Sequence, residues 1–184
     1  MNREEALKLI KEKVQNNNLV KHCLSTEACM QGLAEHFSED KEKWGLTGLL
    51  HDIDYEETKN APEKHSLIGA EMLEKLGLEK DIVEAVKTHN EAHGIKPETK
   101  MAKAIFCIDP LTGLIVASVL VLPSKKIVDL TTENVLNRFK EKSFAKGANR
   151  EIIFKCQDLL GLSLEEFVKI GLEAMKKISN ELGL

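Results

Sequence analysis

The sequence has few cysteines, and their spacing excludes two common uses of this residue. Cys23, Cys29, Cys107 and Cys156 include no C-x-x-C pair. Thiolate zinc sites and redox motifs normally contain this short spacing, and disulfide frameworks belong to oxidising compartments. We therefore expect four small buried side chains in a cytoplasmic protein.

Positive charge and aromatic residues are also scarce. Lys and Arg total 26 against 30 Asp and Glu, giving a net charge of −4, and only 4% of the residues are aromatic. Proteins that bind nucleic acid nonspecifically usually carry a basic excess. We therefore expect no nucleic-acid partner, and few side chains able to stack on a base.

Long hydrophobic runs are missing as well. The longest apolar stretch, residues 114–122, is less than half of the roughly 20 residues that a membrane-spanning helix needs. The opening residues, MNREEALKLIKEK, contain no apolar signal-peptide segment. We expect no membrane partner.

What the sequence does contain favours helices. Ala, Leu, Glu, Lys and Met are plentiful, and apolar residues recur at helical spacing. Capping boxes at Asn2 and Ser163 and a cap at Thr131 mark helix starts. We expect a single all-α domain over residues 1–184, with helices near 2–14, 19–37, 42–51, 65–76, 79–90, 99–108, 110–122, 132–142, 147–160 and 163–182.

One break lies inside the most apolar segment. Asp109-Pro110 has the order of an N-cap and a first helical residue, so we expect one helix to end there and another to begin. Residues 115–121 are rich in β-branched side chains and would also suit a buried strand. The chain offers no evident partner strand, which favours helix.

A histidine and an aspartate follow the apolar run Leu49-Leu50 in TGLLHDIDYEE. His22, His65, His89 and Asp109 lie at comparable places beside other apolar helices. Each alone is more typical of a hydrogen-bonded structural residue or a cap. His36 and His93 are assigned no site, His93 as a solvated loop residue, and Glu56 and Glu57 are interpreted as surface charge.

Together, these side chains form a set of metal donors. Imidazoles and carboxylates without cysteine suit Fe, Mn, Zn, Ni or Mg. A carboxylate can bridge two cations and an imidazole cannot, so Asp52 is the candidate bridge between two ions.

The order His22, His51-Asp52, Asp109 resembles the HD-domain superfamily of metal-dependent phosphohydrolases. LLHDID matches its His-Asp signature, and HSLIGAEML and VKTHNEA resemble the segments that carry extra histidines in the HDIG and HD-GYP subset. The resemblance covers a metal-binding core at about residues 19–122. Residues 123–184 form a helical extension that resembles the C-terminal region of small bacterial HDIG-type hydrolases.

The resemblance implies a ligand set for one or two divalent ions. One ion would bind His22, His51, Asp52 and Asp109, and the second would bind Asp52, His65 and His89. Asp54 and Tyr55 stand where the HDIG signature has glycine and often lysine, and the GYP motif is absent, which disfavours cyclic-di-GMP as a substrate.

The implied activity is hydrolysis of a phosphate mono- or diester, with nucleotides among the candidate substrates, by a metal-activated water at His51 and Asp52. Asp54 and Glu56 are candidates to orient a ligand histidine. Candidate contacts to a phosphorylated small molecule or nucleotide are Tyr55 and the basic residues Lys140, Lys142, Lys146 and Arg150, although a solvated basic face is the more ordinary interpretation of the basic group.

Two other functions fit the same residues. Mixed-valent diiron oxygenases use a similar ligand set on the HD fold, and iron content with oxygen uptake would identify one. A degenerate HD module that only binds a nucleotide would be catalytically silent when loaded with metal.

Overall fold

The computed structural model describes residues 1–184, and every regular element in it is a helix, which confirms the predicted all-α fold. The α-helices, in chain order, are α1 (Arg3–Lys13), α2 (Asn17–Phe37), α3 (Lys41–Leu50), α4 (Tyr55–Thr58), α5 (Leu67–Lys75), α6 (Lys80–Thr88), α7 (Lys100–Leu120), α8 (Thr132–Lys140), α9 (Arg150–Phe154), α10 (Cys156–Leu160), α11 (Leu164–Lys177) and α12 (Ser179–Leu182). Two short 3-10 helices, Glu91–His93 and Ile127–Asp129, lie in the connections.

Local sequence signals start several of these helices. The Asn2 side chain accepts a hydrogen bond from the Glu5 backbone N–H, and the Glu5 carboxylate accepts one from the Asn2 N–H. Ser163 and Glu166 form the same reciprocal cap before α11, and Thr131 caps α8. These pairs satisfy donors that the first turn of a helix leaves free. The predicted caps at Asn2, Thr131 and Ser163 are confirmed.

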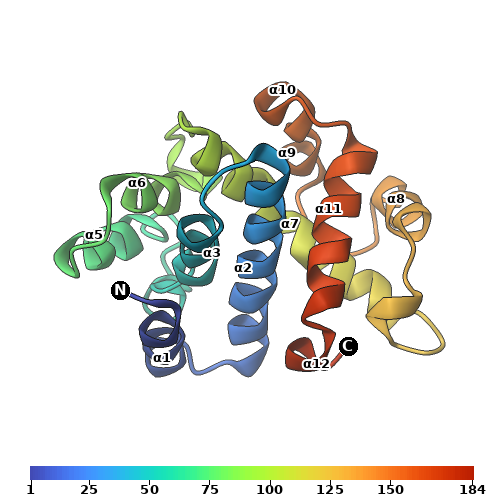
Figure 1. Ribbon diagram of the computed structural model, residues 1–184, viewed down its shortest axis with the longest axis horizontal. Coiled ribbons are helices and arrows are strands. Elements are labelled where there is room, and N and C mark those ends of the chain that lie inside the picture. The colour runs from blue at the N-terminus through green and yellow to red at the C-terminus, as the bar shows by residue number, and fades with distance from the viewer.

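Helix α2 stands at the centre of the molecule (Figure 1) and packs on α3, α7 and α11. Helices α5 and α6 lie on the side of α3 away from α11, and α7 crosses behind α2. One apolar core runs through all of these elements. Since α2, α3, α6 and α7 meet around this core, residues at their ends or on their facing sides come together.

The predicted break at Asp109-Pro110 is wrong: α7 runs without interruption from Lys100 to Leu120, with Pro110 inside it. Proline removes one backbone donor from a helix. The helix continues because Ile105, Ile108, Leu111 and Ile115 are fully buried on both sides of the proline. Tertiary packing outweighs the local stop signal.

Helix α7 is also long and apolar enough to cross a membrane, judged by length and composition alone, and 61% of its apolar window is buried inside the fold. This burial is what a central core helix shows.

The C-terminal helices are shorter than predicted. The expected helix over 147–160 is divided at Lys155 into α9 and α10, and the one over 163–182 is divided at Ile178 into α11 and α12. Helices α9 and α10 pack on α7, while α11 packs on α2. The extension therefore covers the two helices that carry His22 and Asp109.

Candidate metal centre

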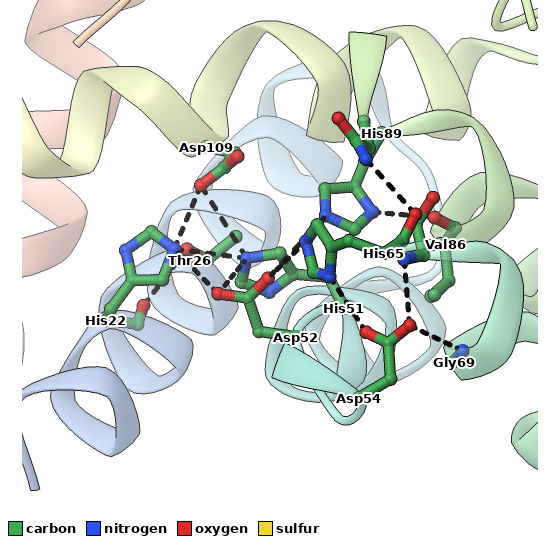
Figure 2. A network of polar contacts seen from close by, with 12 residues as sticks. His22, Thr26, His51, Asp52, Asp54, His65, Gly69, Val86, His89 and Asp109 are labelled. Carbon is green, nitrogen blue, oxygen red and sulfur yellow. Dashed lines mark hydrogen bonds and ion pairs between the residues drawn. The ribbon is translucent and has the colours of Figure 1, made fainter. Parts of the chain in front are cut away.

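The fold brings together all six residues predicted to ligate metal (Figure 2). They come from different places in the chain: His22 from α2, His51 and Asp52 from the turn after α3, His65 from the turn before α5, His89 from the end of α6, and Asp109 from the middle of α7.

Asp52 lies between two groups of histidines. Its Oδ2 is 3.5 Å from both His22 Nε2 and His51 Nε2. Its Oδ1 is 3.1 Å from His65 Nε2 and 3.6 Å from His89 Nε2. Each oxygen therefore faces its own histidine pair, which is the arrangement expected of a carboxylate that bridges two cations.

We call His22, His51, Asp109 and Asp52 Oδ2 the first half-centre, and His65, His89 and Asp52 Oδ1 the second half-centre. In the first, Asp109 Oδ1 is 2.9 Å from His22 Nε2 and 3.6 Å from His51 Nε2. The two Nε2 atoms are 3.1 Å apart in the first half-centre and 3.2 Å apart in the second.

The far side of each imidazole ring has its own hydrogen-bond acceptor. His51 Nδ1 lies 2.8 Å from the Gly48 carbonyl, and His89 Nδ1 lies 2.6 Å from the Val86 carbonyl. A carbonyl only accepts, so both Nδ1 atoms carry the proton. In the neutral ring, this leaves the Nε2 lone pair directed at Asp52.

His22 is held by a hydroxyl. Thr112 Oγ1 donates to the Asp109 carbonyl at 2.8 Å and lies 3.0 Å from His22 Nδ1. Because its proton is used on the carbonyl, the hydroxyl accepts from His22 Nδ1–H. Thr112 thus links two ligands of the first half-centre, a role that no sequence motif indicated.

His65 is held by a carboxylate. Asp54 Oδ1 lies 2.9 Å from His65 Nδ1, and Asp54 Oδ2 accepts from the backbone N–H groups of Ser66 and Gly69, both at 2.8 Å. The Asp54 side chain is fully buried. Its predicted place beside a ligand histidine is confirmed; Glu56 instead accepts from Asn16 N–H and lies by Lys59.

Two glycines permit this geometry, and both could have been read as signals. A Cβ on Gly48 would lie 2.7 Å from the Thr26 carbonyl oxygen of α2, so only glycine lets α3 approach α2 closely enough to set His51 beside His22. A Cβ on Gly69 would lie 3.2 Å from the Asp54 carboxylate. The spacing G-L-L-H, with Gly48 three residues before His51, marks this close approach.

Burial and charge act against each other in the cluster. Burial lowers the pKa of His51, but the negative charges of Asp52 and Asp109 outweigh it and raise that pKa to about 9. Burial likewise lowers the pKa of His65, and hydrogen bonds to Asp52 and Asp54 raise it to about 10. Burial raises the pKa values of Asp52 and Asp109, and the neighbouring histidines hold both below their usual range. Protons or cations bound between these side chains therefore stabilise the cluster.

The donor set fits a divalent cation. Two ligand atoms about 2.1 Å from one metal ion, the usual zinc–imidazole distance, lie about 3.0–3.4 Å apart in octahedral or tetrahedral geometry. The Nε2 pairs have this separation. Neutral Nε2 lone pairs that face each other repel unless a proton or a cation lies between them. No lysine or arginine forms an ion pair with Asp52 or Asp109.

Cys23 also lies at the edge of this cluster, within 4.8 Å of donor atoms of His51 and Asp52. Burial strongly raises the pKa of its thiol, which keeps it protonated. All four cysteines are free and buried, as predicted.

A cleft of about 150 Å³ opens beside the second half-centre. It is lined by His65, His89, Asn90, Glu91, Phe106, Asp109, Pro110, Gly147, Asn149 and Ile152. Asn149 Nδ2 donates to the Glu91 carboxylate at 3.0 and 3.2 Å. The C-terminal extension therefore supplies one wall of the cleft.

The basic residues predicted to contact substrate do not line this cleft. The side chains of Lys140, Lys142 and Lys146 are exposed. Arg150 donates to the carbonyls of Phe144, Ala145 and Ala148 and thereby closes the loop before α9. Because the Arg150 guanidinium donates to these backbone carbonyls, it is not placed to contact a substrate as predicted.

Tyr55 lies beside the second half-centre. Its ring meets the His65 ring edge-on at 5.7 Å between centroids, and it is 42% exposed. His93, expected in solvent, is partly buried, and its Nε2 lies 2.8 Å from Ser66 Oγ. Since Ser66 Oγ donates to the Lys87 carbonyl, it accepts from His93 and ties the loop after His89 to the turn after His65.

Comparison with known proteins agrees with this geometry. The family model described as "HD domain" matches residues 19–114. Ribonuclease Y of Lawsonia intracellularis is 30% identical over 138 residues, which is 73% of this chain and 26% of that protein. Ribonuclease Y of Nitratidesulfovibrio vulgaris strain DP4 is 31% identical over 142 residues, or 74% and 27%. Ribonuclease Y of Thermotoga maritima is 27% identical over 169 residues, or 90% and 32%.

The chain thus spans about a quarter to a third of these relatives. Their name, a ribonuclease, stands against the expectation of no nucleic-acid partner. The family supports a metal-dependent phosphohydrolase, and the His/Asp cluster is able to hold a divalent metal. The matched segment contains all six clustered residues and covers more than half of the sequence, so the chain belongs to the HD-domain family.

Proposed function

We propose that this protein hydrolyses a phosphate ester and that its two half-centres hold two divalent cations. The observation that carries the proposal is the position of Asp52, whose two oxygens face two separate histidine pairs. A single-ion site would not require four histidines around one carboxylate.

Divalent cations bound there would lower the pKa of a bound water and stabilise charge on the phosphoryl oxygens. The chain's own residues provide the geometry. Asp52 and Asp109 neutralise the cations, while Gly48, Val86, Thr112 and Asp54 fix the rings through Nδ1.

The second half-centre is the place where substrate would meet the cations. It has three protein donors, against four in the first, and it lines the cleft. Catalytic metal sites characteristically keep a position open for water or substrate. Phe106 and Ile152 make part of the cleft wall apolar, which limits the access of further water.

No lysine or arginine lines the cleft. The charge of a phosphate group there would be balanced by the bound cations alone. We therefore expect strict metal dependence, with no residual activity in the metal-free protein.

RNA is a second candidate substrate because the relatives are ribonucleases. The net charge of −4 and the cleft without basic residues favour a small phosphate ester instead. An RNA strand would draw on the exposed lysines 140, 142 and 146, outside the cleft.

The test begins with metal-free protein reloaded separately with Mn²⁺, Fe²⁺, Zn²⁺, Ni²⁺ or Mg²⁺. Each form is assayed with 4-nitrophenyl phosphate, bis(4-nitrophenyl) phosphate, a nucleotide panel and a short single-stranded RNA. We expect release of nitrophenol or phosphate with at least one metal, and loss of it in His89→Ala.

Oxygen uptake is measured in the iron-loaded samples. Substrate-dependent oxygen consumption without ester cleavage would show that the protein is an oxygenase and not a hydrolase. Cleavage of RNA alone would move the substrate class to nucleic acid.

A further inference from the structure

A groove of about 470 Å³ begins where the first half-centre ends. It is lined by Asn18, Lys21, His22 and Ser25 of α2, by Thr112, Gly113, Val116, Ala117 and Leu120 of α7, and by Leu182, Gly183 and Leu184. Thr112 lies one turn of helix beyond Asp109, so the groove follows α7 away from the metal ligands.

The apolar part of the groove lining is aliphatic, and the polar part comes from Asn18, Lys21, His22, Ser25 and Thr112. Val116, Ala117, Leu120, Leu182 and Leu184 supply its apolar side chains, and Leu120 is 53% exposed. No phenylalanine, tyrosine or tryptophan lines it, and no aspartate or glutamate does. A volume of this size is typical of small-molecule sites. The lining suits a saturated chain and offers no aromatic surface on which a nucleobase could stack.

The metal centre opens toward this groove. His22 and Asp109 are the most exposed of the six ligand side chains, at 24% and 27%, against 16% or less for the other four. His22 lines the groove, and Asp109 lines the small cleft. A molecule held at the centre therefore has two places for the rest of its structure.

The two places differ in size. The cleft has a volume of about 150 Å³. The groove is roughly three times larger. The groove therefore has more room than the cleft for an organic group attached to a phosphate.

We propose that the groove binds the organic part of the phosphate ester, and that this part is an aliphatic chain rather than a nucleoside. The proposal rests on the phosphoester hydrolase function and names its substrate class. In this proposal Gly113, Ala117 and Leu120 determine which organic group the protein accepts. These three residues lie outside the proposed metal centre.

Gly113 offers a variant that fills the groove without damaging the fold. A Cβ there meets no atom within 4 Å, and the residue is exposed on a helix, where leucine is favoured over glycine. Gly113→Leu places a side chain beside His22, Leu120→Glu puts a charge at the far end, and Leu76→Glu changes an exposed leucine outside the groove as the matched control.

The substrates are the methyl, butyl and octyl esters of 4-nitrophenyl phosphate, assayed with metal-loaded protein. Each methylene moved from water to an apolar surface is worth roughly fourfold in affinity when fully buried. Allowing for an open groove, we expect kcat/KM for the octyl ester to exceed that for the methyl ester by at least about 30-fold in the wild type.

Gly113→Leu should reduce this octyl-to-methyl ratio at least about tenfold, because about three methylenes lose their contacts. Leu120→Glu should reduce the ratio for octyl more than for butyl. Leu76→Glu should keep the wild-type ratio. A wild-type ratio near one, or a Gly113→Leu ratio equal to the wild type, would overturn the proposal.

A binding measurement separates this proposal from the hydrolase function. Calorimetry compares octyl phosphate with methyl phosphate on the same metal-loaded proteins, with no cleavage required. Tighter binding of octyl phosphate that is lost in Gly113→Leu supports the groove even if no ester is cleaved. Cleavage of the methyl ester with no dependence on chain length retains the hydrolase and rejects the groove.

Discussion

Two residues of the first half-centre lie inside long helices, whereas the histidines of the second lie at the ends of shorter ones. His22 and Asp109 lie inside the 21-residue helices α2 and α7, whose cores pack on each other. His65 precedes α5 in a turn, and His89 follows the 9-residue α6. In the second pair, His65 Nδ1 donates to the Asp54 carboxylate, the His65 carbonyl accepts from Asn90 Nδ2, and His89 Nδ1 donates to the Val86 carbonyl. All four rings are thus oriented by hydrogen bonds at Nδ1, and only the first half-centre adds the packing of two long helices.

The half-centres also differ in charge and access. The first has two carboxylates, Asp52 and Asp109, whereas the second has only its share of Asp52. Both histidines of the second half-centre line the cleft, whereas only Asp109 of the first does. We infer that the first holds its ion more tightly and that the second is where substrate and water exchange.

Of the substitutions that test the difference between the two half-centres, removal of the Asp109 charge should have the largest effect. Asp109→Asn should release the ion of the first half-centre and lower kcat/KM by at least about 10³-fold, because a bound metal contributes several kcal/mol of transition-state stabilisation. Metal content should fall by one ion per chain. Retention of both ions would show that Asp109 is not a ligand; Asp158→Asn, an exposed aspartate of α10, is the control.

The charge on Asp54 distinguishes the second half-centre. Asp54→Asn keeps the side-chain shape but removes the charge beside His65 Nδ1, and outer-shell changes of this kind cost about 10–100-fold in metal affinity. A metal titration should show the weaker of two steps becoming weaker still, with the tighter step unchanged. The control is Glu56→Gln, because Glu56 contacts no ligand. An equal loss in both steps would contradict the assignment.

The hydroxyl of Thr112 has the corresponding role in the first half-centre, without a charge. Thr112→Val should weaken the tighter step by about tenfold, at the lower end of such effects, and Thr112→Ser should restore it. Valine keeps the bulk of threonine without its hydroxyl, and serine keeps the hydroxyl with less bulk, so recovery by serine assigns the effect to the hydroxyl. If serine and valine behaved alike, packing rather than the hydrogen bond would orient His22.

Acidity gives the mildest test. The pKa values of His51 and His65 are raised to about 9 and 10 from the ordinary 6.5. Protonated rings therefore stabilise the metal-free fold fully below about pH 6.5, and this stabilisation is lost as the pH rises through 9 to 10. The melting temperature of the metal-free protein should fall by a few degrees over this range, at roughly 2–4 °C per kcal/mol for a chain of this size.

The metal-loaded protein should lack that decline, since the cations replace the protons. A metal-free melting temperature that is constant or rises between pH 6.5 and 9.5 would disagree with the charge balance of the cluster.

The sequence predicted which side chains gather in the cluster better than it predicted the helices that carry them. The six donors are recognisable because the His-Asp dipeptide and the spaced histidines follow apolar runs. The helix break at Pro110 was wrong because the burial of Ile108 and Leu111 is a tertiary effect that no local signal contains. The divisions at Lys155 and Ile178 were missed for the same reason.

The residues that hold the rings were only partly predictable. Asp54 departs from the family signature, and that departure identified it. Thr112 acts on His22, 90 residues away in the sequence, so only the fold reveals its role, whereas the G-L-L-H spacing offered a signal for Gly48. The groove along α7 was likewise hidden, because Gly113, Ala117 and Leu120 look like ordinary helix residues in the sequence.

If Asp52 joins two metal sites, its removal should change the number of ions bound per chain. Wild type and Asp52→Ala are dialysed against the same divalent metal and analysed by mass spectrometry of the elements. We expect two bound ions per chain in the wild type and fewer than one in Asp52→Ala. A wild type that binds no ion, or an Asp52→Ala protein that keeps both, would contradict this expectation.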